Sequence, residues 1–333
     1  MSQKNMQVIF ANRPHGWVQE SNFRIVETEL PVLQDGEVLV KNMYLSLDPY
    51  MRGRMSTAKS YTAGAELGQV MVGGTVGVVI ESKNPNFHVD DTVLGYFGWQ
   101  QYGISKGRGL QKITTPGIPP SAYLGVVGMP GLTAWIGFIS IGQPKEGETV
   151  VVSAASGAVG SVVGQLAKSR GCRAVGIAGG KTKCEYVVNE LGFDACVDYK
   201  AGKLKEDLAA ATPDGIDVYF ENVGGEILDA VLPHLNAFAR IPLCGLVSQY
   251  NATEPYGVRQ FRALLTSRVK LQGFIVGEHA NLFPQAQQEL EQLVLAGKLK
   301  YRESIAQGLE NAPKAFIGLL KGENFGKQLV KLF

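Results

Sequence analysis

The sequence predicts an α/β protein with two domains, a doubly wound parallel sheet and a smaller antiparallel, barrel-like β domain. Short β-type runs punctuated by glycine fill the first part of the chain, at 36–43, 74–81 and 92–96. Beyond residue 122, strand and helix patterns alternate, with strands expected at 149–153, 173–178, 195–197, 216–220, 239–244 and 270–275. Six strands joined by helical crossovers are typical of a doubly wound sheet.

The end of the chain returns to β-type patterning, with strands expected at 301–305 and 327–332 around a helix at 312–320. We expect this tail to rejoin the first domain. Residues 1–122 with 301–333 would then form one domain and residues 123–300 the other, with a ligand cleft between the two lobes.

Composition excludes several classes of function. The formal net charge of the 333 residues is +2 and no long Lys/Arg run occurs, so nucleic-acid binding is not expected. No apolar stretch approaches the roughly 18 residues of a membrane span, and the N-terminus leads into no signal-peptide hydrophobic region. Four scattered cysteines form no C-x-x-C pair, which argues against a disulfide framework and a structural zinc. We therefore expect a cytoplasmic protein.

The most informative segment is 150–161, where an apolar β-branched run breaks into a turn of small residues and continues as a helix. Gly157 lets the backbone approach a phosphate closely, and Gly160 lets the new helix pack on the sheet with its N-terminal amides facing the anion. Ala155 replaces the usual first glycine of G-x-G-x-x-G. A tight strand-to-helix turn without a ligand requires similar residues, so this segment alone leaves both interpretations open.

The next predicted strand, 173–178, ends in Gly179-Gly180-Lys181-Thr182-Lys183. An NAD site normally places a carboxylate here on the ribose 2′-hydroxyl, and none is present. Glycines leave room for a 2′-phosphate and lysines supply charge, so the segment predicts NADPH rather than NADH. Alternatively, Lys181 and Lys183 are solvated residues of a first helical turn.

Several motifs follow one another in an order that resembles the medium-chain dehydrogenase/reductase superfamily. Within it, the chain looks closest to the zinc-free leukotriene B4 12-hydroxydehydrogenase/prostaglandin reductase group and its bacterial curcumin-reductase branch. The motifs cover essentially the whole chain: LDPYMR (47–52), GMPGLTA (128–134), the 155–161 turn, ENVGG (221–225), CGLVSQYN (244–251) and GLLKGENFGK (318–327).

The resemblance implies a GroES-like N-terminal domain, a Rossmann domain and a homodimer. It also implies NADPH-dependent reduction of the C=C bond of α,β-unsaturated ketones and aldehydes. The cofactor-binding residues carried over by motif position are Met129, Ala155, Ser156, Gly157, Ala158, Val159, Gly160, Gly180, Lys183, Tyr199, Asn222, Cys244, Gly245, Phe274, Ile275, Val276, Asn324 and Gly326. Two of these have simpler explanations, since Asn222 also fits a turn cap and Phe274 also fits ordinary core.

Zinc chemistry of the alcohol dehydrogenase type is not expected. No cysteine precedes Cys172, and His15 and His88 are the only histidines before His234. Cys/His/Glu ligands are therefore not available in the first domain in the required pattern.

Reduction of an enone places negative charge on the carbonyl oxygen, so the site needs a hydrogen-bond donor there. Tyr250 is the expected catalytic donor, because it follows the strand that ends near Cys244 and carries a phenolic hydroxyl. Tyr50 and Tyr61 are expected to hold an aromatic or phenolic end of the substrate. Each tyrosine also fits a structural role, and quinone or carbonyl reduction, or NADPH sensing with little turnover, remain alternative functions.

Overall fold

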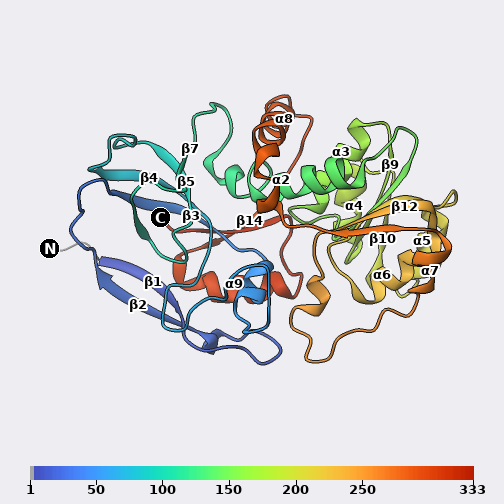
Figure 1. The fold of residues 1–333 in the computed structure, drawn as a ribbon, viewed down its shortest axis with the longest axis horizontal. Helices are drawn as coiled ribbons and strands as arrows, with labels where there is room; N and C mark the ends of the chain where they lie inside the picture. The colour runs from blue at the N-terminus through green and yellow to red at the C-terminus, as the bar shows by residue number, and fades with distance from the viewer. Residues whose placement is uncertain (1–3) are drawn as a thin grey trace. The chain divides into compact units, whose positions relative to one another are not determined.

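The computed structural model describes residues 4–333, and the chain divides into two compact units (Figure 1). Unit 1 comprises Met1–Leu124 and Glu303–Phe333, and unit 2 comprises Gly125–Arg302. Unit 2 is therefore continuous in sequence, whereas unit 1 is assembled from the two ends of the chain.

Unit 1 is built on a seven-stranded sheet in the order β14-β15-β3-β4-β5-β7, in which β6 also pairs with β3. All its pairs are antiparallel except β14–β15. A separate antiparallel pair is formed by β1 and β2. The strands are β1 (Lys4–Phe10), β2 (Phe23–Glu29), β3 (Val38–Ser46), β4 (Thr75–Ser82), β5 (Thr92–Gly95), β6 (Tyr102–Ser105), β7 (Gln111–Lys112), β14 (Glu303–Gln307) and β15 (Lys327–Lys331).

An aromatic cluster ties the C-terminal tail to the rest of unit 1. The fully buried Trp99 ring stacks on Phe23 with centroids 5.1 Å apart and meets the Phe316 ring edge-on at 5.7 Å. Phe316 belongs to α9 (Ala312–Leu320), the only α-helix of the tail among the described residues; α1 (Tyr50–Arg54) lies in the N-terminal part.

Unit 2 contains a six-stranded sheet in the order β10-β9-β8-β11-β12-β13, with all pairs parallel. Numbered within the sheet, this is the 3-2-1-4-5-6 order of a doubly wound dinucleotide-binding fold. The strands are β8 (Thr149–Ser153), β9 (Arg173–Ala178), β10 (Ala195–Asp198), β11 (Ile216–Phe220), β12 (Leu235–Leu243) and β13 (Lys270–Gly273).

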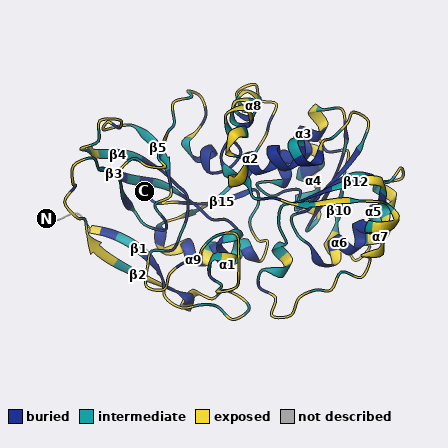
Figure 2. Cartoon of the chain, viewed as in Figure 1, coloured by how far each residue is buried: buried dark blue, intermediate teal, exposed yellow. Residues whose placement is uncertain are grey.

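Helices connect these strands. Residues 160–167 of α3 are all buried, and Figure 2 shows this helix largely in the buried colour. The helices of unit 2 are α2 (Met129–Trp135), the π-helix η3 (Ile136–Gly142), α3 (Gly160–Ser169), α4 (Lys181–Asn189), α5 (Leu204–Ala211), α6 (Gly225–Val231), α7 (Arg262–Thr266), the 3₁₀ segment η7 (Val276–Leu282) and α8 (Phe283–Leu295). Three 3₁₀ turns of three residues each are η4 (Tyr199–Ala201), η5 (Leu232–His234) and η6 (Val247–Gln249). No helix within residues 4–333 combines the length and apolar character that crossing a membrane requires.

The largest departure from the predicted strands is in β12, which begins at Leu235 rather than at residue 239. Phe238 has a positive φ of 65°, and the pairing shifts from Ile216↔Leu235 to Val218↔Arg240. This irregularity breaks the apolar pattern, so the sequence reveals only the part of the strand that follows it. β13 ends at Gly273 rather than 275, because Ile275 already caps η7.

Candidate active site

The turn after β8 explains why alanine occupies the first glycine position of the fingerprint. The buried Ala155 donates its N–H to the carbonyl of Ile177 at 3.0 Å. Its methyl group faces Gly176 of β9, where an added Cβ would lie 2.8 Å from the Ala155 Cβ. Gly176 on the neighbouring strand therefore leaves room for the Ala155 methyl group, and the turn lies close to the sheet.

The two glycines that remain in the fingerprint are under steric constraint. A Cβ on Gly160 would lie 2.4 Å from the Ala154 carbonyl oxygen, and one on Gly157 would lie 3.1 Å from the same atom. The N–H of Ser161 bonds the Gly157 carbonyl at 3.0 Å, so α3 starts directly from the turn. Residues 157–159 are only half-buried. The partly accessible residues therefore lie in the turn directly before the N-terminus of this ten-residue helix, the end of a helix that attracts anions.

The ends of β9 and β10 bring together the residues expected at a 2′-phosphate. The Asp198 carboxylate accepts hydrogen bonds from the backbone N–H groups of Gly180 at 2.7 Å and Lys200 at 2.9 Å. The Tyr199 ring covers Gly179, because a Cβ added there would lie 2.9 Å from the Tyr199 hydroxyl oxygen. Asp198 thereby joins the start of α4 to the turn after β10.

Lys183 and Lys200 lie close enough to influence each other. Burial first, and the positive charge of Lys200 second, lower the pKa of the Lys183 ammonium from its ordinary value. Sequence reasoning missed Lys200. Lys200 could have been predicted from the sequence, because it directly follows Tyr199, just beyond a predicted strand.

Asn222 lies at the carboxyl end of β11 and contacts the end of β8. Its side-chain amide donates to the Ser153 carbonyl at 2.8 Å, and its backbone N–H donates to the Ser153 hydroxyl at 2.8 Å. Ser153 directly precedes the turn that contains Ala155 and Gly157. Asn222 therefore links two segments at the same edge of the sheet, which goes beyond the local turn cap considered from sequence.

Tyr250 folds back onto the loop that follows β12. Its hydroxyl oxygen accepts a long hydrogen bond of 3.4 Å from the N–H of Leu246, and a Cβ added to Gly245 would lie 3.0 Å from that oxygen. Burial, followed by the charge of Glu221, raises the pKa of the Cys244 thiol to about 12, so this thiol stays protonated at neutral pH. The loop thus places the Tyr250 phenol beside its own residues Gly245 and Leu246.

Phe274 is a core residue in this structure. It is 8% exposed and its ring meets Phe220 edge-on, with centroids 6.3 Å apart. A Cβ on Gly137 of η3 would lie 2.5 Å from the Phe274 ring. Ile275 and Val276, which follow it, are half-buried. They remain the more accessible part of this predicted nicotinamide segment.

Met129 also belongs to unit 2, as the first residue of α2. It is half-buried, and its carbonyl accepts a hydrogen bond from the Thr133 hydroxyl at 2.7 Å. Apart from Met129, the cofactor-binding residues predicted in unit 2 all lie at or just beyond the carboxyl ends of strands, which is where doubly wound sheets bind ligands.

The remaining predicted residues belong to unit 1. The hydroxyl oxygens of Tyr50 and Tyr96 lie 3.3 Å apart, and sequence reasoning missed Tyr96 because the two are 46 residues apart. Burial first, then Asp48 and Tyr96, raise the pKa of Tyr50 above its ordinary value, so its hydroxyl keeps its proton. Tyr61 is 60% exposed in the loop that follows α1.

Asn324 and Gly326 lie between α9 and β15 of the same unit. The Asn324 side-chain amide donates to the Gly326 carbonyl at 2.7 Å, and Gly326 has a positive φ of 75°. The turn is also held from β14, because the Ser304 hydroxyl donates to the Phe325 carbonyl at 2.8 Å and accepts from the Phe325 N–H at 3.0 Å. Within residues 4–333, no group of three or more His, Cys, Asp or Glu side chains is arranged to hold a metal ion.

Comparison with known proteins gives the family. Residues 6–113 match a model described as the N-terminal domain of oxidoreductase, and residues 158–292 match one described as zinc-binding dehydrogenase. The chain is 52% identical to the NADPH-dependent curcumin reductase of Escherichia coli, over 99% of this chain and 97% of that protein. The chain belongs to the medium-chain dehydrogenase/reductase family.

Other relatives and solved structures agree with this assignment. A 2-alkenal reductase (NADP(+)-dependent) of Nicotiana tabacum is 45% identical over 98% of this chain and 97% of its own length. The crystal structure of CurA in complex with NADPH from Vibrio vulnificus superposes with a TM-score of 0.94 at 50% identity, covering 98% of this chain and 99% of that one. The predicted fold class, a GroES-like domain with a Rossmann domain, is confirmed.

Proposed function

We propose that this chain is an oxidoreductase that reduces the carbon–carbon double bond of α,β-unsaturated ketones and aldehydes with NADPH. The observation that carries the proposal is its 52% identity, over nearly the full length of both chains, to an NADPH-dependent curcumin reductase. The 2-alkenal reductase relative and the NADPH complex of CurA support the same reaction class and the same cofactor.

The residues of unit 2 fit this cofactor. Gly157, Gly160 and the start of α3 offer a pyrophosphate site, and steric constraint explains both glycines. Gly180, with φ of 96° and open space where a Cβ would stand, and Lys183 offer room and charge for a 2′-phosphate. Asn222 and the 244–250 loop are the other proposed cofactor contacts at the carboxyl ends of the unit 2 strands.

The chain's own groups then bind and polarise the substrate, while NADPH, when bound, supplies the hydride. The Tyr250 hydroxyl donates a hydrogen bond to the substrate carbonyl oxygen, where negative charge builds up when the β-carbon accepts hydride. A proton from water or from Tyr250 then adds to the α-carbon and gives the saturated product. The backbone N–H of Leu246 donates to the oxygen of the same hydroxyl, which makes the phenol a stronger donor. In unit 1, Tyr50 and Tyr61 are the proposed substrate-binding residues, and Tyr96 adds a second hydroxyl beside Tyr50.

One assay tests this function against its alternatives. Purified protein is incubated with NADPH and an enone, and the products are identified by mass spectrometry and NMR. A saturated ketone supports the proposal, whereas an allylic alcohol would indicate carbonyl reduction. Binding of NADPH with no consumption across a panel of enones and quinones would indicate a sensor.

We also propose that the chain forms a homodimer through the edge strand β13. Leu271 of β13 is 41% exposed, and Phe261 and Leu265, in the α7 segment that precedes β13 in the sequence, are 66% and 79% exposed. A sheet edge with exposed apolar groups favours pairing with a second copy of the chain. Light scattering should give twice the chain mass of 35.9 kDa, and Leu271→Lys should give the single-chain mass.

The cytoplasm is the proposed compartment. All four cysteines are free thiols, as is usual in a reducing environment. Cell fractionation with an antibody against the chain tests this proposal, and recovery outside the cytoplasmic fraction would contradict it.

A further inference from the structure

Glu221 is a buried carboxyl group at the edge of the sheet where the cofactor is proposed to bind. It directly follows β11, and its side chain is fully buried. Burying a carboxyl group is unfavourable unless hydrogen bonds compensate for the lost water. Desolvation raises the pKa of the Glu221 carboxyl, and hydrogen bonds from Val223, Gly224 and Ser153 partly oppose this shift.

The side chain and the main chain of Glu221 bond to three different segments. Its Oε1 accepts hydrogen bonds from the Ser153 hydroxyl at 2.9 Å and the Val223 N–H at 2.6 Å. Its backbone carbonyl accepts from the N–H groups of Cys244 at 2.9 Å and Gly245 at 3.1 Å. Ser153 ends β8, Val223 lies in the turn before α6, and Cys244 opens the loop that leads to Tyr250.

Ser153 extends this connection to Asn222. The Ser153 hydroxyl donates to Glu221 and accepts from the Asn222 N–H at 2.8 Å, while the Ser153 carbonyl accepts from the Asn222 side chain at 2.8 Å. The orientation of the Asn222 side chain is therefore set by Ser153, and Ser153 is in turn held by Glu221.

We infer that Glu221 is a positioning residue for NADPH, because its buried hydrogen bonds fix the relative placement of the β8 turn, Asn222 and the 244–250 loop. The inference rests on the proposed function, since those segments are the proposed cofactor contacts. Glu221 itself need not touch the cofactor. Loss of Glu221 displaces the groups that touch the cofactor. A displacement of about 1 Å at such groups can lower the reaction rate about a hundredfold.

The experiment measures NADPH binding directly, by fluorescence titration of purified protein without any enone. Glu221→Ala removes the acceptor for Ser153 and Val223, and the expected NADPH Kd rises by about tenfold or more. Glu221→Gln keeps an acceptor oxygen in the same place, so its Kd should stay within about threefold of wild type. Ser153→Ala should also weaken binding, and the double variant with Glu221→Ala should lose less than the sum of the two.

A second readout separates positioning from a general loss of stability. With NADPH at saturating concentration, kcat of Glu221→Gln and Ser153→Ala should remain within a few-fold of wild type, while KM for NADPH rises in Ser153→Ala. If Glu221→Ala does not fold, the NADPH Kd values of Ser153→Ala and Glu221→Gln still test whether Glu221 positions the cofactor contacts.

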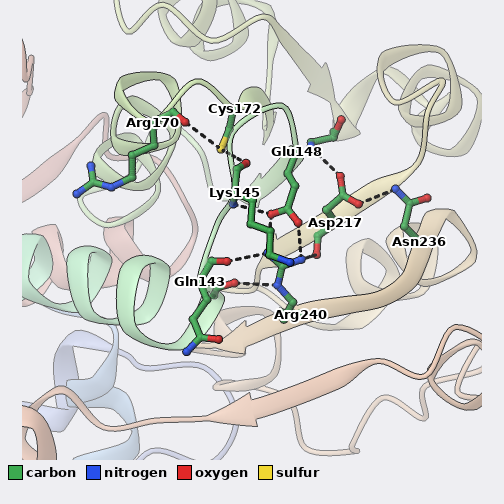
Figure 3. A network of polar contacts seen from close by, with 10 residues as sticks. Gln143, Lys145, Glu148, Arg170, Cys172, Asp217, Asn236 and Arg240 are labelled. Carbon is green, nitrogen blue, oxygen red and sulfur yellow. Dashed lines mark hydrogen bonds and ion pairs between the residues drawn. The ribbon is translucent and has the colours of Figure 1, made fainter.

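The matched control is the polar network around Glu148 and Arg240, which Figure 3 shows from close by. Glu148 precedes β8 and pairs with Arg240 at 2.5 Å, while Asp217 of β11 accepts from the Thr149 N–H at 2.9 Å. Glu148→Gln should lower the melting temperature but leave the NADPH Kd unchanged. This network is partly buried and sits at the amino ends of the strands, away from the proposed cofactor edge.

Two outcomes would overturn the inference: NADPH binding equal to wild type in whichever of Ser153→Ala and Glu221→Ala is folded, or an equal weakening in Glu148→Gln. Failure of the proposed function looks different. In that case the wild-type protein would bind NADPH but form no saturated ketone, and the binding comparison would still test Glu221.

Discussion

The ammonium group of Lys327 lies 2.7 Å from the Asp48 carboxylate, and both side chains are less than 10% exposed. Lys327 also donates to the Leu47 carbonyl at 2.7 Å, and the Ser46 hydroxyl donates to the other Asp48 oxygen. The first residue of β15 is thereby fixed to the segment that leads into α1 and Tyr50.

Removal of one partner from this pair should strongly destabilise unit 1. Lys327→Met leaves a buried, uncompensated carboxylate, for which we expect a loss of about 3–5 kcal/mol in the free energy of unfolding. Urea denaturation measures the change. The double variant Asp48→Leu/Lys327→Met should recover part of the loss, and a larger loss in the double variant would contradict this account.

Tyr250→Phe should lower kcat for enone reduction by about ten- to a thousandfold, because the variant loses the donor to the carbonyl oxygen. The NADPH Kd should change little, since the ring and the loop are kept. Steady-state kinetics and fluorescence titration measure the two effects. An unchanged kcat would remove Tyr250 from the reaction.

Lys183→Ala should weaken NADPH binding by about 1–3 kcal/mol and leave NADH binding nearly unchanged, because only NADPH carries the 2′-phosphate. Titration with both cofactors measures the difference. Lys181→Ala is the control, since the Lys181 side chain is 86% exposed and its partner is Glu185 of the same helix. Equal losses for NADPH and NADH would contradict the assigned role.

The raised pKa of Glu221 predicts a pH dependence of stability. The folded state holds this proton more tightly than the unfolded state does. The resulting stabilisation is complete below the unfolded pKa of about 4.3 and is lost as pH rises through the higher folded value. Unfolding free energies of wild type and Glu221→Gln, compared from pH 4 to pH 8, should therefore diverge with rising pH, with the wild type losing more. Parallel curves would show that Glu221 does not titrate in this range.

Elements with an uninterrupted local pattern were predictable. The central strands β8 and β11 lie at the bounds predicted, because strands buried on both faces are rich in apolar residues, and Asp217 is the one charged residue in the two strands. The start of β12 was not, because the irregular pairing at Phe238 depends on its neighbour β11 rather than on its own residues.

The same distinction holds for the candidate site. The 155–160 turn and Lys183 were predictable because the residues that identify them are neighbours in the sequence. The contacts of Tyr96 with Tyr50, of Glu221 with Ser153 and of Asp48 with Lys327 join residues 46, 68 and 279 positions apart. Only the folded chain brings such pairs together, and no single sequence pattern marks them.

Strand β15 pairs with β3 inside the unit 1 sheet, although the two strands come from opposite ends of the chain. During synthesis, the ribosome delivers the whole of unit 2 before the last strand of unit 1 has emerged. Unit 2 is thus free to fold while translation continues, whereas the N-terminal strands of the unit 1 sheet lack their partners β14 and β15 until those strands are made. A premature stop codon that removes only β14 and β15 would therefore leave unit 1 incomplete, although its N-terminal part is synthesised first.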